Sequence, residues 1–162
     1  MIRNIFLICS CLFLFIRCTS AEIIENTEDP EIINENPPTF ISYEMQVVEI
    51  VNTERVKQKL SPLSVDESLM KSCDVRAKEL VKSFSHTRPD GSSCFTSIET
   101  SYNAAGENIA YGQNSAQAVM TGWMNSEGHR NNILSDSYTH IGVGCYENNN
   151  RLYWVQLFIR KK

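Results

Sequence analysis

The chain has 162 residues, of which 42% are hydrophobic and 21% are charged, with seven glycines and five prolines. This composition excludes a collagen-like, a coiled-coil and a wholly disordered chain, and the length suits one ordinary globular domain. The formal net charge of −4 provides no basic surface for phosphate backbones, so we expect no nucleic-acid partner.

The first twenty residues have the pattern of a secretory signal peptide. An almost unbroken apolar run of twelve residues (5–16) follows a short polar start, and Arg17 ends the run. A membrane-spanning helix needs about 20 apolar residues, whereas the apolar part of a signal peptide needs only about 7–15. Small side chains permit cleavage after Ser20 or Ala21. We therefore expect residues 1–20 to be a signal peptide and the protein to be secreted and extracellular. The alternative is an uncleaved leader, which would then be the only contact of the protein with a membrane.

Residues 21–39 differ in composition from the rest of the chain. They contain six acidic residues, no lysine or arginine, and three prolines. Such a segment lacks the aromatic residues and the periodicity that burial requires, so we expect an extended acidic linker. From residue 40 onward thirteen acidic residues balance thirteen basic ones. The domain expected over 40–162 is therefore electrically neutral.

Three later segments have the periodicity of amphipathic helices. The segment 43–60 carries valines at mostly helical spacing, and Pro62 follows its end. The segment 64–82 begins with a capping-box pattern in which Ser64 is the expected N-cap. Ser115 is expected to cap a third helix over 116–125, and a short helical turn follows it. The side chains expected to face the core are Val47, Val48, Val51 and Val56 on the first helix, Leu69, Cys73, Ala77, Leu80 and Phe84 on the second, and Val119, Met120 and Trp123 on the third.

The C-terminal part of the chain predicts a β-hairpin. The segments 139–146 and 152–159 are rich in β-forming residues, and 147–151 is expected to join them as a longer loop. The second segment is nearly continuous in apolar residues, which is typical of a strand covered on both faces. We therefore expect an α/β (α+β) fold, a three-layer α/β/α sandwich with a mainly antiparallel central sheet.

Three cysteines remain once the leader is removed, namely Cys73, Cys94 and Cys145. An odd number in an oxidising compartment allows one bridge and a free thiol, or one intermolecular bridge. We expect at most one intramolecular bridge, with the remaining thiol buried. Cys94 follows His86 closely, but its turn-rich surroundings favour a bridge or a core thiol over a nucleophile.

Four segments together resemble the secreted CAP (SCP) domain superfamily, which includes the cysteine-rich secretory proteins, insect antigen 5 and plant pathogenesis-related proteins. The resemblance extends over about residues 43–160, is closest to the short microbial members, and implies the same sandwich. Its segments are SHTRPDGSSCFT (85–96), GENIAYG (106–112), GWMNSEGHRNNIL (122–134) and YTHIGVGCY (138–146).

The resemblance implies a cleft with two histidines and two glutamates, which here correspond to His86, Glu107, Glu127 and His129. Animal and plant members have a longer insert between the second glutamate and the second histidine. Such a tetrad has three alternative roles: a hydrogen-bonded structural cluster, a reversible metal site, or a catalytic site. In the metal site, His86 and His129 are the expected ligands for Zn²⁺ while the carboxylates orient the rings.

The resemblance implies no single activity, and the function we favour is a secreted, non-enzymatic binding module in host or cell-surface interaction. Its partner is an unknown extracellular molecule or a lipid, and it requires no cofactor, although a divalent metal, zinc, is the candidate for the cleft. Two alternatives stay open, a metal-dependent hydrolase with Glu107 as base, and a purely structural surface domain. His140 is expected to be structural. The chain has no His-Glu-x-x-His, Gly-x-Ser-x-Gly, phosphate-loop or Cys-x-x-Cys motif.

Overall fold

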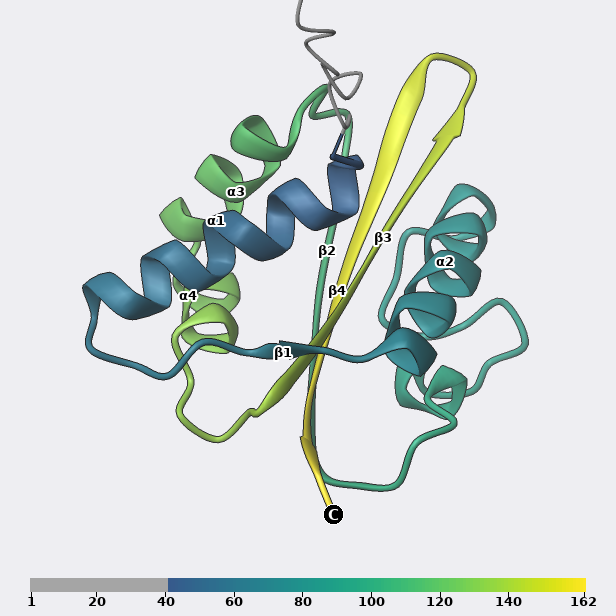
Figure 1. Ribbon diagram of the computed structural model, residues 1–162. Helices are drawn as coiled ribbons and strands as arrows, with labels where there is room; N and C mark the ends of the chain where they lie inside the picture. Colours follow the sequence, from purple (N-terminus) through teal and green to yellow (C-terminus); the bar gives the residue numbers. More distant parts are fainter. Residues whose placement is uncertain (1–40) are drawn as a thin grey trace, which may run out of the picture. The chain divides into compact units, whose positions relative to one another are not determined.

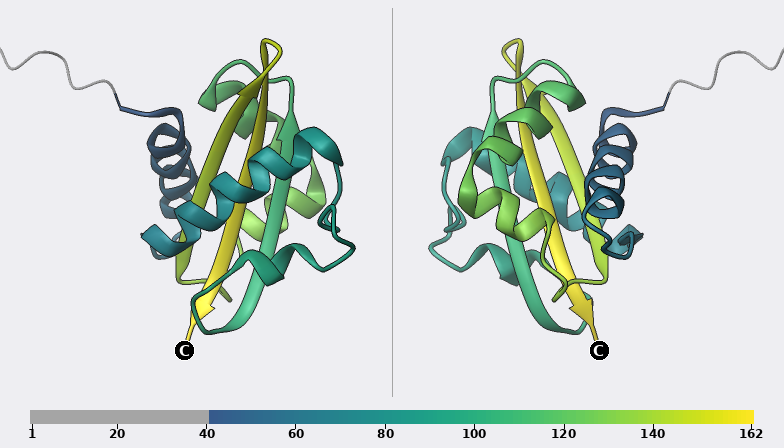
Figure 2. Two further views of the ribbon diagram at one scale, coloured as in Figure 1. Left: turned by 90° about the vertical axis from the view of Figure 1, so that its right-hand side faces the viewer. Right: turned by 90° about the vertical axis from the view of Figure 1, so that its left-hand side faces the viewer.

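The computed structural model describes residues 41–162, so the expected signal peptide (1–20) and acidic linker (21–39) lie outside the described residues. Helices cover both faces of one central sheet, with α1, α3 and α4 on one face and α2 on the other (Figures 1 and 2). This arrangement confirms the expected α/β/α sandwich. In chain order the elements are α1 (Tyr43–Lys57), β1 (Ser64–Val65), α2 (Glu67–Lys82), the 3-10 helix η1 (Cys94–Ser97), β2 (Tyr102–Tyr111), α3 (Ala116–Asn125), α4 (Glu127–Ile133), β3 (His140–Asn148) and β4 (Arg151–Lys161).

The sheet has the strand order β1-β3-β4-β2. β4 pairs antiparallel with both β2 and β3, and only the two-residue β1 is parallel to its neighbour β3. The sheet is therefore mainly antiparallel, as expected. β2 lies at one edge, where segments from both faces of the sandwich can reach it.

The central strand β4 belongs to two apolar cores. Every residue from Trp154 to Ile159 is buried. Trp154 and Phe158 pack with α1 and α3, whereas Leu157 and its neighbours on the opposite face pack with α2. The continuous apolar run of this strand thus has the predicted cause, burial on both faces.

Of the two predicted N-caps, that of α3 is confirmed and that of α2 is wrong. Ser115 accepts a hydrogen bond from the backbone of Ala118 and caps α3, as expected. At α2, however, the cap is Asp66, whose carboxylate accepts from the Leu69 amide at 3.0 Å. Ser64 instead belongs to β1 and pairs with His140 of β3, which keeps the chain extended up to Asp66.

Two side chains expected in the core are exposed. Val56 is 56% exposed, and its neighbour Arg55 is buried in its place. The Arg55 guanidinium donates to the carbonyls of Ile133 and Ser135 at 2.8 and 2.7 Å, which satisfies the C-terminal end of α4. Phe84 is exposed because α2 ends at Lys82 and the helical stripe does not continue.

The connection between β3 and β4 is also shorter than expected. It is a two-residue turn in which Asn149 and Asn150 have φ values of 50° and 58°. Positive φ at both central positions suits the right-handed twist of a hairpin, and asparagine tolerates it.

Within residues 41–162 the three cysteines are free thiols, and the expectation of at most one bridge stays a prediction. Cys73 is buried between α2 and the sheet, as its position on the helix predicted. Cys94 is also buried, and Cys145 is partly buried.

Helix α2 lies unusually close to β3. A Cβ atom at Gly142 or Gly144 would lie 2.5 Å from backbone atoms of Leu69 or Cys73, respectively. The two glycines therefore allow the helix backbone to approach the strand.

None of the helices within residues 41–162 is long and apolar enough to cross a bilayer.

Candidate functional site

The candidate site forms around the edge strand β2, whose successive side chains point to opposite faces of the sheet. Glu107 points toward α2, where it meets Arg76. Asn108 points the other way and hydrogen-bonds α4. Two neighbouring residues of one strand therefore connect the site to both helical layers.

Glu107 is held by one cation and by the ring of His86. The Nε and Nη2 atoms of Arg76 lie 2.9 and 3.3 Å from its two carboxylate oxygens, and Nδ1 of His86 lies 2.8 Å from Oε2. The side chains of Arg76 and Glu107 are 0% and 1% exposed, whereas that of His86 is 57% exposed. The buried ion pair thus orients an imidazole that faces solvent.

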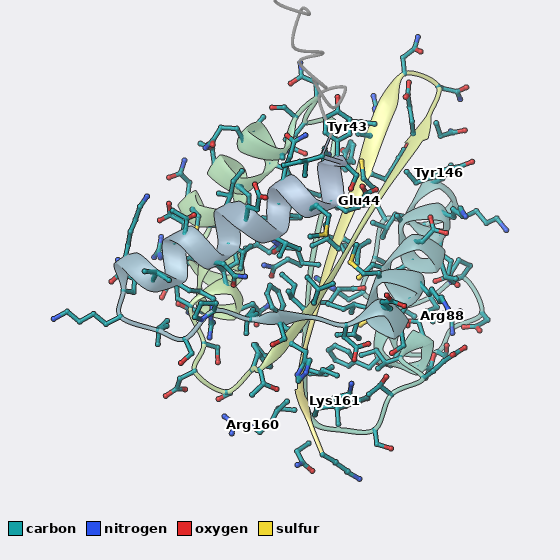
Figure 3. The ribbon with its side chains drawn as sticks, viewed as in Figure 1. Tyr43, Glu44, Arg88, Tyr146, Arg160 and Lys161 are labelled. Carbon is teal, nitrogen blue, oxygen red and sulfur yellow. The ribbon has the colours of Figure 1, made fainter. Side chains whose placement is uncertain are left out.

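A second ion pair fixes the segment that carries His86. Glu79 accepts from Arg76 at 2.8 Å and from Arg88 at 2.7 Å, and Arg88 lies on the α2 side of the molecule (Figure 3). Burial by itself raises the pKa of Glu79, but the hydrogen bonds from Arg88 and Arg76 outweigh burial and lower the pKa below its ordinary value. Arg76 also donates to the Ser85 carbonyl at 2.8 Å. The loop before and after His86 is therefore anchored to α2.

Cys94 lies beside this pair at the start of η1. Its backbone amide donates to the His86 carbonyl at 3.0 Å. Burial, and then the charge of Glu107, raises the pKa of the thiol to about 11. A raised pKa favours the protonated thiol at neutral pH, whereas a nucleophilic cysteine has a lowered one.

His129 approaches the same edge from α4. It lines a cavity of about 280 Å³ whose walls include Phe84, Tyr111 and Trp123. Burial, and then the charge of His86, lowers the pKa of His129 below its ordinary value. The imidazole is therefore neutral at neutral pH, the form that binds metals.

A buried amide network fixes the position of α4. Asn108 donates to the carbonyl of His129 at 3.1 Å and to Oε1 of Gln156 at 3.0 Å. Asn132 of α4 donates to Oδ1 of Asn108 at 2.9 Å and to the carbonyl of Glu107 at 3.2 Å. The backbone at His129 is therefore tied directly to β2.

Glu127 and His140 lie apart from this arrangement. Glu127 is exposed in the first turn of α4, where a carboxylate interacts favourably with the helix dipole. Within residues 41–162, no hydrogen bond or ion pair joins Glu127 to His86, Glu107 or His129. His140 is on β3 and its Nδ1 lies 2.8 Å from the Thr139 hydroxyl. That His86, Glu107, Glu127 and His129 act as one functional site stays a prediction.

Arg76, the buried partner of Glu107, was not among the site residues predicted from the sequence. A signal was present, because Arg76 lies three residues after Cys73 and four before Leu80 and so belongs to the apolar stripe of the helix. A charged residue on such a stripe requires a buried partner.

The family model of the cysteine-rich secretory protein family, CAP, matches residues 48–158. The chain belongs to the CAP family. The matched range begins within α1, ends within β4 and contains every element between them.

Relatives of known sequence or structure agree with this assignment. The uncharacterized protein YkwD of Bacillus subtilis (strain 168) is 40% identical over 148 residues, which cover 88% of this chain and 57% of YkwD. An extracellular SCP-domain protein from Bacillus anthracis (strain Ames) has a similar structure, with 31% identity and a TM-score of 0.68 over 74% of this chain and 40% of that one. NaASP2, whose crystal structure was determined with Zn²⁺, is 15% identical with a TM-score of 0.55 over 78% of this chain and 90% of that one. The chain thus spans little more than half of YkwD.

Proposed function

We propose that this CAP domain is a secreted binding module that holds a zinc ion at the edge of β2, with His86 and His129 as ligands. The observation that carries the proposal is the contact between Glu107 and His86. A histidine that binds metal through one ring nitrogen commonly uses the other to contact a carboxylate. Here Nδ1 of His86 lies 2.8 Å from Glu107, which leaves Nε2 available on the exposed side of the ring.

The donor chemistry of the site fits zinc. Imidazole nitrogens are favoured zinc ligands, and they bind in the neutral form. Burial lowers the pKa of His129 and so favours its neutral form at neutral pH. Asn108, the neighbour of Glu107 on β2, holds the backbone of His129. Zinc at this position supplies a positive charge that a carboxylate or phosphate group of an extracellular partner can bind. NaASP2 provides a CAP-fold precedent for zinc in the crystal.

A binding role is better supported than hydrolysis. A general base needs a carboxylate that reaches a bound water, whereas Glu107 is 1% exposed and both of its oxygens accept hydrogen bonds from Arg76 or His86. We therefore assign Glu107 a positioning role. Secretion is supported by the leader-like segment and by the extracellular relative from Bacillus anthracis.

A zinc titration of the full-length protein tests the proposal. We expect calorimetry at neutral pH to detect one zinc per chain, and His86→Ala and His129→Ala each to weaken binding at least about tenfold. His140→Ala is the matched control, because His140 is the remaining histidine of the chain and lies on β3.

Circular dichroism should show that all three variants are folded, since none of these side chains belongs to an apolar core. Zinc binding that is unchanged in His86→Ala and His129→Ala, or that is lost equally in His140→Ala, contradicts the proposal. Turnover in a hydrolase screen with zinc present would instead favour the enzyme.

A further inference from the structure

A third type of metal-binding side chain lies in the site. The sulfur of Cys94, a ring nitrogen of His86 and a carboxylate oxygen of Glu107 all lie within 4.8 Å of one another. Two ligand atoms on one tetrahedral zinc are separated by about 3.3–3.7 Å, as bond lengths of about 2.0–2.3 Å require. The sulfur and the imidazole therefore need only small adjustments to contact the same ion, with Glu107 beside them to orient the ring.

The backbone creates this proximity. The Cys94 amide donates to the carbonyl of His86, and a β-bridge between Thr87 and Ser93 closes the loop that separates them. Glu107 is fixed independently by Arg76. Cys94 is thus positioned by main-chain hydrogen bonds, whereas the more exposed ring of His86 retains freedom to adjust.

An ion can reach the sulfur although Cys94 itself is 3% exposed. The three groups line one cavity of about 400 Å³, together with Phe95, Asn132 and Tyr138. This volume is many times that of one water molecule, so a hydrated ion can enter and lose water to the protein ligands.

We propose that Cys94 is a metal ligand that acts with His86, whose ring Glu107 orients, and makes the site selective for thiophilic divalent ions such as Zn²⁺, Co²⁺ and Cd²⁺. The proposal rests on the proposed function, since His86 is shared, and adds a thiolate to it. Cys94 and His86 supply two of the four ligands that tetrahedral zinc takes. Binding releases the thiol proton of Cys94 to solvent, and the sulfur then donates an electron pair to the metal.

The ligand chemistry determines which ions bind. Thiolate favours zinc and other soft or borderline metals, whereas Mg²⁺, Ca²⁺ and Mn²⁺ favour sites made of oxygen ligands. We therefore expect a large excess of Mg²⁺ or Ca²⁺ not to displace zinc. A site made only of imidazole and carboxylate would discriminate less strongly against Mn²⁺.

Cobalt provides a direct test, because a thiolate bound to Co²⁺ produces a charge-transfer band in the near ultraviolet. We expect the band to saturate at one Co²⁺ per chain of reduced, full-length protein. Cys94→Ser and Cys94→Ala should abolish the band and weaken cobalt binding at least about tenfold. Cys145→Ser is the matched control, since Cys145 is a free and partly buried thiol on β3, and it should retain both.

The outcomes separate this inference from the proposed function. Cobalt binding without the band, or a band that persists in both Cys94 variants, overturns the role of Cys94 and leaves the histidine site standing. If the wild-type protein binds neither cobalt nor zinc, the proposed function itself is wrong. A zinc-edge X-ray absorption spectrum of the wild-type protein needs no variant, and we expect one sulfur at about 2.3 Å; a spectrum with only nitrogen and oxygen neighbours overturns the proposal.

Discussion

At the scale of single residues, a carboxylate that is almost fully buried requires compensation, and Glu107 receives it from two groups of different character. Arg76 is buried and always charged, so it balances the carboxylate at every pH of interest. His86 is exposed and contributes a ring that faces the cavity. Removing the permanent cation therefore affects folding, whereas removing the imidazole affects what the site binds.

Arg76→Met should destabilise the protein strongly. The change leaves Glu107 buried without its cation, and breaking a buried pair in this way typically costs about 3–5 kcal/mol. Urea unfolding at neutral pH measures the free energy of unfolding. Adding Glu107→Gln to the variant should recover part of the loss, because an amide has no charge to compensate.

The matched control for Arg76→Met is Lys78→Met, which removes a cation from the same helix. Lys78 pairs with Asp74 at 2.7 Å, but both side chains are 53% exposed. Exposed pairs contribute about 0–1 kcal/mol, so this variant should remain close to wild type. Equal effects of the two substitutions would contradict the role assigned to Arg76.

At the scale of secondary-structure elements, the packing of α2 on β3 depends on glycine. Gly144→Ala should lower the free energy of unfolding by about 1–3 kcal/mol or more. The new Cβ would lie 2.5 Å from the carbonyl carbon and oxygen of Cys73 and would push the helix away from the strand. Thermal and urea unfolding measure the loss.

Gly128→Ala is the control for the glycine prediction. Gly128 lies in α4, and a Cβ there has no neighbour within 4 Å. Alanine favours helix over glycine by up to about 1 kcal/mol, so this variant should be neutral or more stable. A Gly144→Ala protein as stable as Gly128→Ala would show that α2 adjusts without cost.

The elements themselves were largely predictable, since each is encoded by a local pattern. The stripe Leu69, Cys73, Ala77 and Leu80 was sufficient to place α2, and the apolar run of β4 predicted helices on both faces. The errors arose where tertiary contacts outweighed local patterns. Ser64 belongs to a strand because β3 pairs with it, although the same residues in isolation form a capping box.

The candidate site was predictable only in part, for the same reason. Family motifs pointed to His86 and Glu107, which the structure brings into contact. The partners that hold Glu107 and α4 come from distant segments: Arg76 is 31 residues before Glu107 and donates to its carboxylate, and Asn132 follows it by 25 residues and donates to its carbonyl. Sequence spacing does not report such contacts.

At the scale of the whole domain, an ion pair joins the C-terminal strand to the start of α2. Lys161 donates to Asp66 at 2.7 Å, and Figure 3 shows Lys161 close to the C-terminus. Burial alone raises the pKa of Asp66, but hydrogen bonds from Lys161, Ser68 and the Leu69 amide outweigh it and hold the pKa well below its ordinary value. A carboxylate with a lowered pKa in the folded state stabilises the fold at pH values above its unfolded pKa of about 3.9, and this contribution is lost as the pH falls further.

Asp66→Asn should therefore reduce stability at pH 7 and change it little in strong acid. Asparagine retains the N-cap, so the variant removes mainly the charge. Because the Lys161 side chain is 44% exposed, we expect the ion pair to account for no more than about 1 kcal/mol of the difference at pH 7. Urea unfolding at pH 7 and pH 2.5 should show the two proteins converging at the lower pH. A difference that is the same at both pH values would contradict the assigned ionisation.

The buried amide of Gln156 helps to fix the register of β4 against β2. In most sheets the alternation of apolar and polar residues specifies the register, because a slip by one residue exposes the apolar face. β4 is apolar on both faces, so that penalty is weak here. Gln156 lies opposite Asn108 of β2 and hydrogen-bonds it. A shift by one residue would turn this amide away from Asn108 and toward the apolar core beside α2, so this polar pair favours one alignment of an otherwise uniform strand.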